Sequence, residues 1–406
     1  MSGSKVYLDY NSTTPLAPEV FSTITEALQR CWANPSSSHE EGVLARQCIE
    51  KARGHVAAMI GAKDSDIIFT SGCTESNNAV LRSCVRHHQH LSKEEGTTML
   101  PHIVTSNLEH GSVLRTAQEL ADNGEIELTV IKANPRCGHV LVDDVIGAIK
   151  QNTVLVSIMH ANNETGVIQP VKEISLQMAR LIKEQKYTDL FLHTDTAQTC
   201  GKIPVNVSEL GVDFISIAGH KFYGPRIGAL YIRDLESKTV PFYPMIIGVG
   251  QERGYRSGTE DTGYIAGMGK AAELVCNNLD TYHKQLKEIR DYLEQQLTEH
   301  FGDDVHFNAR FDGVERIPNT SNVSLIGKNL EGWNVLKNLK HSMASTGSAC
   351  HSKTAKASQT LLCSGVPEDI ARNAMRLSLG RNTTKEDVHI FIADLRETVK
   401  ALKLVN

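Results

Sequence analysis

The feature that most constrains the fold of this chain is a regular alternation, from residue 66 to residue 232, of short β-branched runs with segments of helical character. The first run covers 67–70, and a helical segment over 74–87 separates it from a second run at 102–105. A third run follows at 126–131. Because parallel strands need long crossover connections, which are usually helices, this alternation predicts a mostly parallel β-sheet flanked by helices.

Residues 153–159, Thr-Val-Leu-Val-Ser-Ile-Met, form the most apolar of these runs. A run without polar alternation is typical of a central strand that is covered on both faces. Further strand-like runs at 191–193, 214–217 and 229–232 predict the later members of the sheet. We therefore assign the chain to the α/β class.

The pattern changes after residue 263, where apolar residues recur near the helical period as far as Leu297. This spacing predicts a long helix that leads into a second domain. At 406 residues the chain also exceeds what one hydrophobic core usually holds. We predict a large, mostly parallel-sheet domain over 16–264 and a smaller α+β domain formed by 1–15 and 265–406.

Composition narrows the range of partners. A net charge of -5 gives no electrostatic reason to expect nucleic acid or an anionic membrane as a partner. No apolar run approaches the roughly 18 residues of a membrane span, and the first residues contain no signal-like segment, so we expect a cytoplasmic protein. The nine cysteines include no C-x-x-C pair, which predicts neither disulfides nor a metal site.

Two charged residues stand directly after predicted strands. Lys221 lies in the glycine-bounded stretch Gly219-His220-Lys221-Phe222-Tyr223-Gly224, although a lone lysine is more often a surface residue. Asp195 ends another strand, at the sheet edge where open α/β sheets bind ligands. An aspartate so placed can pair with a pyridinium nitrogen and keep it protonated. The alternative role for Asp195 is a helix N-cap.

Two further motifs suit a phosphorylated, planar ligand. Residues 70–78, Thr-Ser-Gly-Cys-Thr-Glu-Ser-Asn-Asn, read as a strand, a glycine turn and a helix start, where free backbone N–H groups can hold a phosphate. Simple helix capping by Thr74 explains the same pattern. His110 follows another strand, and its imidazole could stack on a planar cofactor or be an ordinary polar loop residue.

Together these segments resemble the cysteine desulfurase and selenocysteine lyase family, in the aminotransferase class V branch of the pyridoxal-phosphate enzymes. The resemblance extends from Tyr7 to about Arg381. It rests on six motifs: 70–77, Glu109-His110, Asn162-Asn163-Glu164-Thr165-Gly166, Asp195 with Gln198, Gly219-His220-Lys221, and Arg256-Ser257-Gly258-Thr259. The resemblance implies pyridoxal 5'-phosphate as cofactor, the fold type I of pyridoxal-phosphate-dependent transferases, and a homodimer.

The resemblance also implies roles for individual residues. Lys221 would form the Schiff base, His110 would stack on the ring, and Asp195 would pair with the pyridine nitrogen. Gln198 and Asn163 would contact the ring oxygen. Thr74 and His220 would hold the phosphate, and Thr259 would reach it from the other subunit. One departure is Ala218, where many desulfurases carry a phosphate-binding serine. Either Ser216 or backbone groups would have to replace that contact.

The resemblance places the substrate between two further residues. Cys350, in the polar stretch Ser345 to Ser352, is the expected acceptor of the chalcogen, although an arbitrary cysteine there would be an inert turn residue. Arg376 corresponds to the arginine that clamps the substrate carboxylate, with a strand-edge arginine as its alternative, and Asn163 also contacts substrate.

The family offers two activities, both of which yield alanine. We expect the lyase branch, which releases reduced or elemental selenium from selenocysteine, because Cys350-His351 and the stretches 221–227 and 243–253 are similar to it. Gly111 favours the alternative, a cysteine desulfurase that delivers persulfide sulfur, because the lyases carry an acidic residue there. An aminotransferase would have no use for Cys350, and a non-catalytic scaffold would be free to lose Lys221. The sequence also leaves open a further partner, a protein that accepts the selenium.

Overall fold

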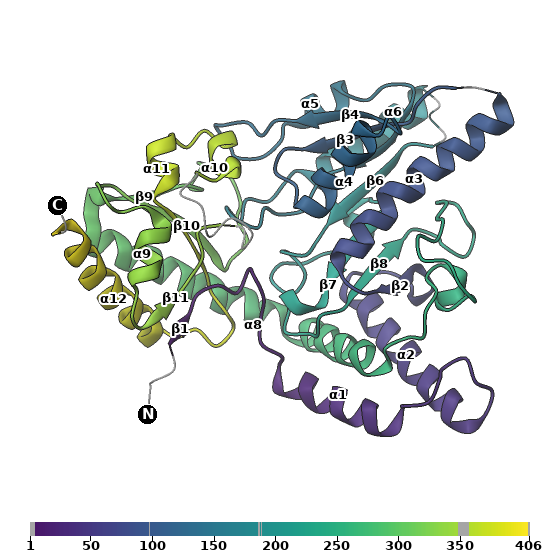
Figure 1. The fold of residues 1–406 in the computed structure, drawn as a ribbon, viewed down its shortest axis with the longest axis horizontal. Helices are drawn as coiled ribbons and strands as arrows, with labels where there is room; N and C mark the ends of the chain where they lie inside the picture. The colour runs from purple at the N-terminus through teal and green to yellow at the C-terminus, as the bar shows by residue number, and fades with distance from the viewer. Residues whose placement is uncertain (1–4, 97, 186, 188, 348–356, 405–406) are drawn as a thin grey trace.

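The larger of two cores is built around a seven-stranded sheet (Figure 1). The computed structural model describes residues 5–96, 98–185, 187, 189–347 and 357–404. The strands run in the spatial order β2-β8-β7-β6-β5-β3-β4. Their bounds are β2 Ile67–Thr70, β3 His102–Ser106, β4 Glu127–Ile131, β5 Thr153–Ser157, β6 Phe191–Asp195, β7 Phe214–Ala218 and β8 Gly228–Ile232. Only β8 pairs antiparallel with its neighbours, so the predicted mostly parallel sheet is confirmed.

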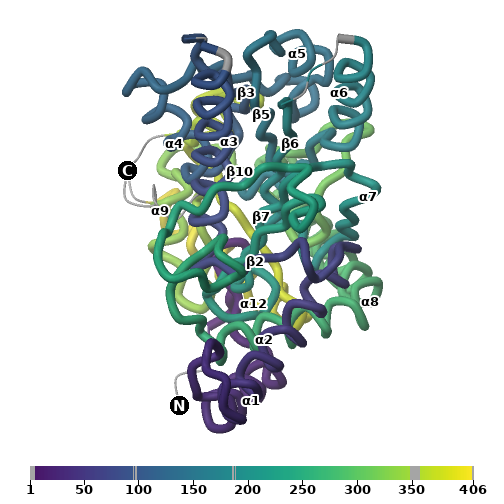
Figure 2. Tube along the Cα trace, turned by 90° about the vertical axis from the view of Figure 1, so that its right-hand side faces the viewer, coloured from purple at the N-terminus to yellow at the C-terminus, as the bar shows by residue number. Residues whose placement is uncertain are grey.

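Helices cover both faces of this sheet (Figure 2). The buried side chains of the strands are divided between the two faces. Leu155 and Phe214 pack against α3 and α4, whereas the neighbouring residues Val156 and Ile215 belong to the core under α2, α6 and α8. The helices of this layer are α2 Glu40–Met59, α3 Cys73–Glu95, α4 Gly111–Asp122, α5 Val142–Gly147, α6 Val171–Gln185 and α7 Val207–Leu210. Burial on both faces explains why the strands are apolar runs rather than alternating ones.

A second core lies around a smaller antiparallel sheet in the order β12-β10-β9. Its strands are β9 Val305–Phe307, β10 Thr320–Leu325 and β12 Ala374–Ser378, and the separate pair β1 Val6–Tyr7 and β11 Ser342–Met343 lies beside them. The helices here are α9 Gly332–Asn338, α10 Gln359–Cys363, α11 Glu368–Arg372 and α12 Lys385–Lys403. Val6 and Leu8 pack into this core, so the amino-terminal segment joins the carboxyl-terminal elements.

The helix α8, Thr262–Phe301, connects the two cores. It runs from below the large sheet into the smaller unit (Figure 1). Its first half, including Met268 and Val275, is packed in the first core, and Leu286 and Leu293 are packed in the second. The long helix expected after residue 263 is therefore confirmed, and the division into 16–264 and the two flanking segments stays a prediction.

Two helices before the sheet, α1 Pro18–Arg30 and α2, were not predicted from the sequence. The helix α3 continues to Glu95 before Gly96 ends it in a left-handed conformation. None of the helices in the described part of the chain combines the length and the hydropathy that a bilayer span requires. The cytoplasmic location expected above stays a prediction.

Candidate active site

A pocket of about 460 Å³ opens at the carboxyl ends of the parallel strands. The segments that follow β2, β3, β5, β6 and β7 all reach it, as the edge rule for open α/β sheets requires. Eight of the predicted residues line it: Thr74, His110, Asn163, Asp195, Gln198, His220, Lys221 and Arg376. Thr259 is exposed and is not among the lining residues, and Cys350 lies outside the described residues.

The carboxylate of Asp195, at the end of β6, is held by three donors. The backbone N–H of Ala197 donates to Oδ1 over 2.9 Å, and the thiol of Cys73 donates to the same oxygen over 3.4 Å. Asn77 donates from Nδ2 to Oδ2 over 2.8 Å. Burial and the Asp195 charge raise the pKa of the Cys73 thiol, which keeps it a donor. Sequence reasoning missed Cys73 and Asn77, although both lie in the 70–78 motif.

Lys221 ends the short 3₁₀ turn Gly219–Lys221 that follows β7. Its Nζ donates to the carbonyl oxygens of Asn11 and Ser12 over 2.6 and 2.8 Å. Burial, followed by the nearby Arg376 guanidinium, lowers the pKa of Lys221 to about 8. A sizeable fraction of the amine is therefore neutral near neutral pH, as an amine that attacks a carbonyl must be.

Arg376, on β12, is buried and lines the same pocket. Nη2 donates to Asp9 Oδ1 and to Ser12 Oγ, each over 2.7 Å, and Nη1 donates to the carbonyl of Asn163 over 3.1 Å. Its Nε is buried and has no hydrogen-bond partner among the described residues. A free, buried guanidinium donor beside a cavity suits a carboxylate ligand.

A buried lysine that the sequence analysis missed supports Gln198. Lys202 donates to Gln198 Oε1 and to Asn11 Oδ1, each over 2.9 Å. Its pKa is lowered well below the usual range by burial and by the charges of Lys221 and Arg376. Gln198 in turn donates from Nε2 to the carbonyl of Asn11 over 3.1 Å. The side chain of Gln198 is thereby fixed at the pocket wall.

The start of α3 forms part of the pocket wall. This helix begins at Cys73 with no side-chain cap on its first N–H groups, and Thr74 lines the pocket beside it. His220 forms a 3.1 Å hydrogen bond with Thr13 Oγ1, and its pKa is lowered to about 4 by burial and by the charges of Lys221 and Arg226. His220 is thus neutral at neutral pH.

The structure bears on which group could replace the serine that is missing at position 218. Ser216 does not line the pocket, and its hydroxyl lies 3.0 Å from Nε2 of His193 in the sheet interior. The suggestion that Ser216 replaces the missing serine is therefore wrong. Ser71 and Arg226 do line the pocket, and neither was singled out from the sequence.

His110 caps the amino terminus of α4 with its own ring. Its Nδ1 accepts a 3.2 Å hydrogen bond from the backbone N–H of Ser112 and lies 2.7 Å from the Ser112 hydroxyl. Gly111 lies beside it, and a Cβ at this position would meet only the Arg115 side chain at an ordinary 3.6 Å. The backbone at position 111 therefore leaves room for a Cβ.

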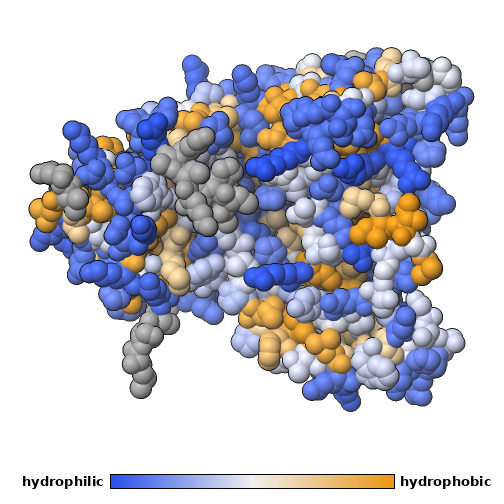
Figure 3. Space-filling model, viewed as in Figure 1, coloured by the Kyte–Doolittle hydropathy of each residue, from blue (hydrophilic) through white to orange (hydrophobic). Residues whose placement is uncertain are grey.

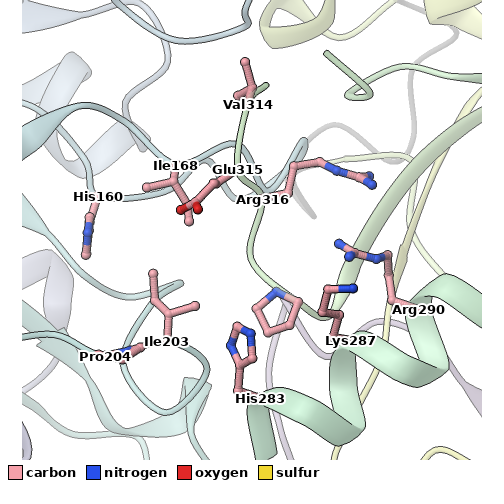
Figure 4. Close-up of a pocket in the computed structure, with 11 residues that line it drawn as sticks. His160, Ile168, Ile203, Pro204, His283, Lys287, Arg290, Val314, Glu315 and Arg316 are labelled. Carbon is pink, nitrogen blue, oxygen red and sulfur yellow. The ribbon is translucent and has the colours of Figure 1, made fainter. Parts of the chain in front are cut away.

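A second cavity, of about 530 Å³, lies away from these residues, between α8 and the segments that follow β5 and β9 (Figure 4). Lys287 and Arg290 reach it from α8, but both are ion-paired with Asp291, at 2.7 and 2.8 Å. Arg316 is paired with Glu294 at 2.9 Å. Because none of the described residues that line this cavity is among the predicted site residues, we place the active site in the first pocket.

Comparisons with known proteins agree with this geometry. The family model for aminotransferase class-V matches residues 6–391. A selenocysteine lyase of Rattus norvegicus is 48% identical over 98% of this chain and 95% of the relative, and a cysteine desulfurase IscS of Dictyoglomus turgidum is 40% identical over 99% and 96%. A solved NifS-like protein superposes with a TM-score of 0.85 at 32% identity and covers 98% of this chain and 100% of its own. The chain therefore belongs to the aminotransferase class-V family of pyridoxal-phosphate-dependent enzymes, in the group that contains selenocysteine lyases and cysteine desulfurases.

Proposed function

We propose that this protein is a pyridoxal-phosphate-dependent selenocysteine lyase, which converts L-selenocysteine to L-alanine and reduced or elemental selenium. The observation that carries the proposal is one pocket that contains Lys221, Asp195, His110 and Arg376 together. The choice of activity is supported by the 48% identity with a selenocysteine lyase, against 40% with a cysteine desulfurase.

The residues of the pocket fit the cofactor. The buried carboxylate of Asp195 would pair with the pyridine nitrogen, Lys221 would supply an amine of lowered pKa to the carbonyl, and His110, which lines the same pocket, would stack on the ring. Thr74 and His220 would hold the phosphate, and Gln198 and Asn163 would contact the ring oxygen. When bound, pyridoxal phosphate supplies a conjugated ring that accepts the electron pair released at the substrate Cα.

Side chains of this protein would bind the substrate and remove its Cα proton. Arg376 binds the substrate carboxylate, and its buried, unpaired Nε supports this role. Lys221 would take the Cα proton at Nζ, and its lowered pKa suits a general base near neutral pH. Asp195 and Gln198 are buried, so the charge of the Asp195 carboxylate acts over a lower dielectric than in water.

The enzyme would distinguish selenocysteine from cysteine by the protonation state of the substrate's selenol or thiol. A thiol with a pKa of roughly 8.5 is mostly protonated at neutral pH, whereas a selenol is more acidic and enters as the anion. A lyase needs only to release selenium along a weaker bond to carbon. A desulfurase needs Cys350 to attack sulfur and become a persulfide. Gly111 is the observation that keeps cysteine desulfurase as the second candidate.

The proposal includes a homodimer in which Thr259 completes the phosphate site of the partner subunit. It is supported by exposed apolar side chains after β8, where Ile247 and Val249 are 76% and 91% exposed. Figure 3 shows this apolar area and a second one over α1, where Phe21 is 62% exposed. Apolar surface of this extent is typical of an interface. A protein that accepts the selenium remains a further proposed partner.

The test is alanine release from L-selenocysteine by the protein reconstituted with pyridoxal phosphate. We expect turnover that Lys221→Ala abolishes, with the variant folding normally. A fully loaded enzyme that releases no alanine from selenocysteine would contradict the proposal.

A further inference from the structure

A chain of hydrogen bonds connects Asp195 to His110 through two residues that have no assigned role. Asn77 Nδ2 lies 2.8 Å from Asp195 Oδ2 and 2.8 Å from Ser112 Oγ. The Ser112 hydroxyl lies 2.7 Å from Nδ1 of His110. Asn77 is fully buried and Ser112 is 8% exposed, so both are shielded from water.

The direction of each bond in this chain is determined by chemistry. A carboxylate can only accept, so Asn77 must present its NH₂ group to Asp195. The same NH₂ donates its second hydrogen to Ser112 Oγ, which accepts it. The hydroxyl proton of Ser112 is therefore directed at Nδ1 of His110.

The backbone gives independent evidence that Nδ1 of His110 is an acceptor. The N–H of Ser112 also points at Nδ1 of His110, over 3.2 Å, and an N–H group can only donate. Two donors thus converge on one ring nitrogen, which must carry a lone pair. When the ring holds a single proton, that proton is on Nε2.

We propose that Asn77 and Ser112 are positioning residues that fix the tautomer of His110, so that Nε2–H is the donor offered to the pocket. His110 lines the pocket, and Nδ1 is occupied on its other edge. The use of this donor toward a chalcogen leaving group rests on the proposed function. The tautomer itself depends only on contacts within the chain.

The arrangement also links the two residues that flank the cofactor site. The orientation of Asn77 is set by the Asp195 carboxylate, and it determines which way the Ser112 hydroxyl points. Loss of the carboxylate would free Asn77 to turn and would release the hydroxyl from His110. The tautomer of His110 is therefore sensitive to Asp195, although no bond joins the two side chains directly.

The test is ¹⁵N NMR of the cofactor-free protein labelled at histidine, with the His110 signals assigned by their loss in His110→Gln. Wild type should show the Nε2–H tautomer. Ser112→Ala should shift the tautomer ratio about fivefold toward Nδ1–H, which is the contribution of one neutral hydrogen bond. Ser112→Thr, which keeps the hydroxyl, should restore the wild-type ratio.

Thr116→Ala is the matched control, because it removes a neighbouring buried hydroxyl of α4 that donates to the carbonyl of Ser112 and not to the ring. It should leave the ratio unchanged. Asn77→Ala is a second variant, and it should shift the ratio in the same direction. Proton density on Nδ1 in wild type, or an unchanged ratio in both Ser112→Ala and Asn77→Ala, would overturn the inference. Because no cofactor or substrate is present, these results are independent of the enzyme's activity.

Discussion

The guanidinium of Arg376 lies 2.7 Å from the carboxylate of Asp9, although the two residues are 367 positions apart in the chain. This ion pair brings the amino-terminal segment to the wall of the pocket, where Ser12 and the carbonyl of Asn163 also hold the guanidinium. Asp9 thus orients the group that we expect to bind the substrate carboxylate.

Removal of this guanidinium should strongly reduce the activity of the enzyme. Arg376→Ala should lower kcat/KM by about 100-fold or more, because the substrate carboxylate would then have no guanidinium to pair with. Asp9→Asn keeps the shape and removes the charge, so it should raise KM about fivefold with little change in kcat. Steady-state kinetics of the two variants checks this. Wild-type KM in Arg376→Ala would contradict the assigned role.

The cofactor should be attached to Lys221. Borohydride reduction of the loaded protein, followed by peptide mapping, should find the label on Lys221 alone. Lys202 is the matched control, since it is also buried and close enough to feel the charge of Lys221, yet is held by Gln198 and Asn11 through its own hydrogen bonds. Label on Lys202, or on any other lysine, would show that the site is assigned incorrectly.

Glu109 should make stability depend on pH. Burial raises its pKa to about 8, and its Oε2 has no partner among the described residues. Because the folded pKa is above the unfolded value of about 4.5, the stabilisation is complete below pH 4.5 and is lost as pH rises through 8. Glu109→Gln keeps an acceptor for Ser106 and Met159 and should remove this loss.

Thermal unfolding of wild type and Glu109→Gln across this pH range provides the measurement. The melting temperature of wild type should fall relative to that of the variant between about pH 4.5 and about pH 8. A constant difference across the range would show that Glu109 does not carry a proton in the folded protein.

The dimer should depend on the apolar segment after β8. Val249→Asp should produce monomers in light scattering, whereas Ile390→Asp, on an exposed position of α12, should not. Thr259→Ala should weaken cofactor retention without unfolding the chain. A fully active monomer would rule out the proposed role of Thr259.

The sequence predicted the part of the site that follows from local motifs. Asp195 ends β6, Lys221 and His110 lie shortly beyond the ends of β7 and β3, and the carboxyl ends of parallel strands converge at one edge. Asp9 and Lys202 were missed because their roles depend on contacts with Arg376 and Gln198 that no local pattern encodes.

The helix α2 was missed for a different reason. The core face of α2 is made largely of small residues, such as Ala45 and Ala52, so its apolar stripe is weak in the sequence. These small residues let α8 approach closely, and a Cβ added at Gly269 would meet Ala52 at 2.5 Å. Close packing of this kind is visible only in three dimensions.

The most direct test of the account compares kcat/KM for alanine release from L-selenocysteine and from L-cysteine, in wild type and in Cys350→Ala. We predict a much higher value for selenocysteine in wild type, since the selenol enters as the anion. Cys350→Ala should abolish activity on cysteine and retain part of the activity on selenocysteine. Equal or higher efficiency with cysteine in wild type would contradict the account and would make the protein a cysteine desulfurase.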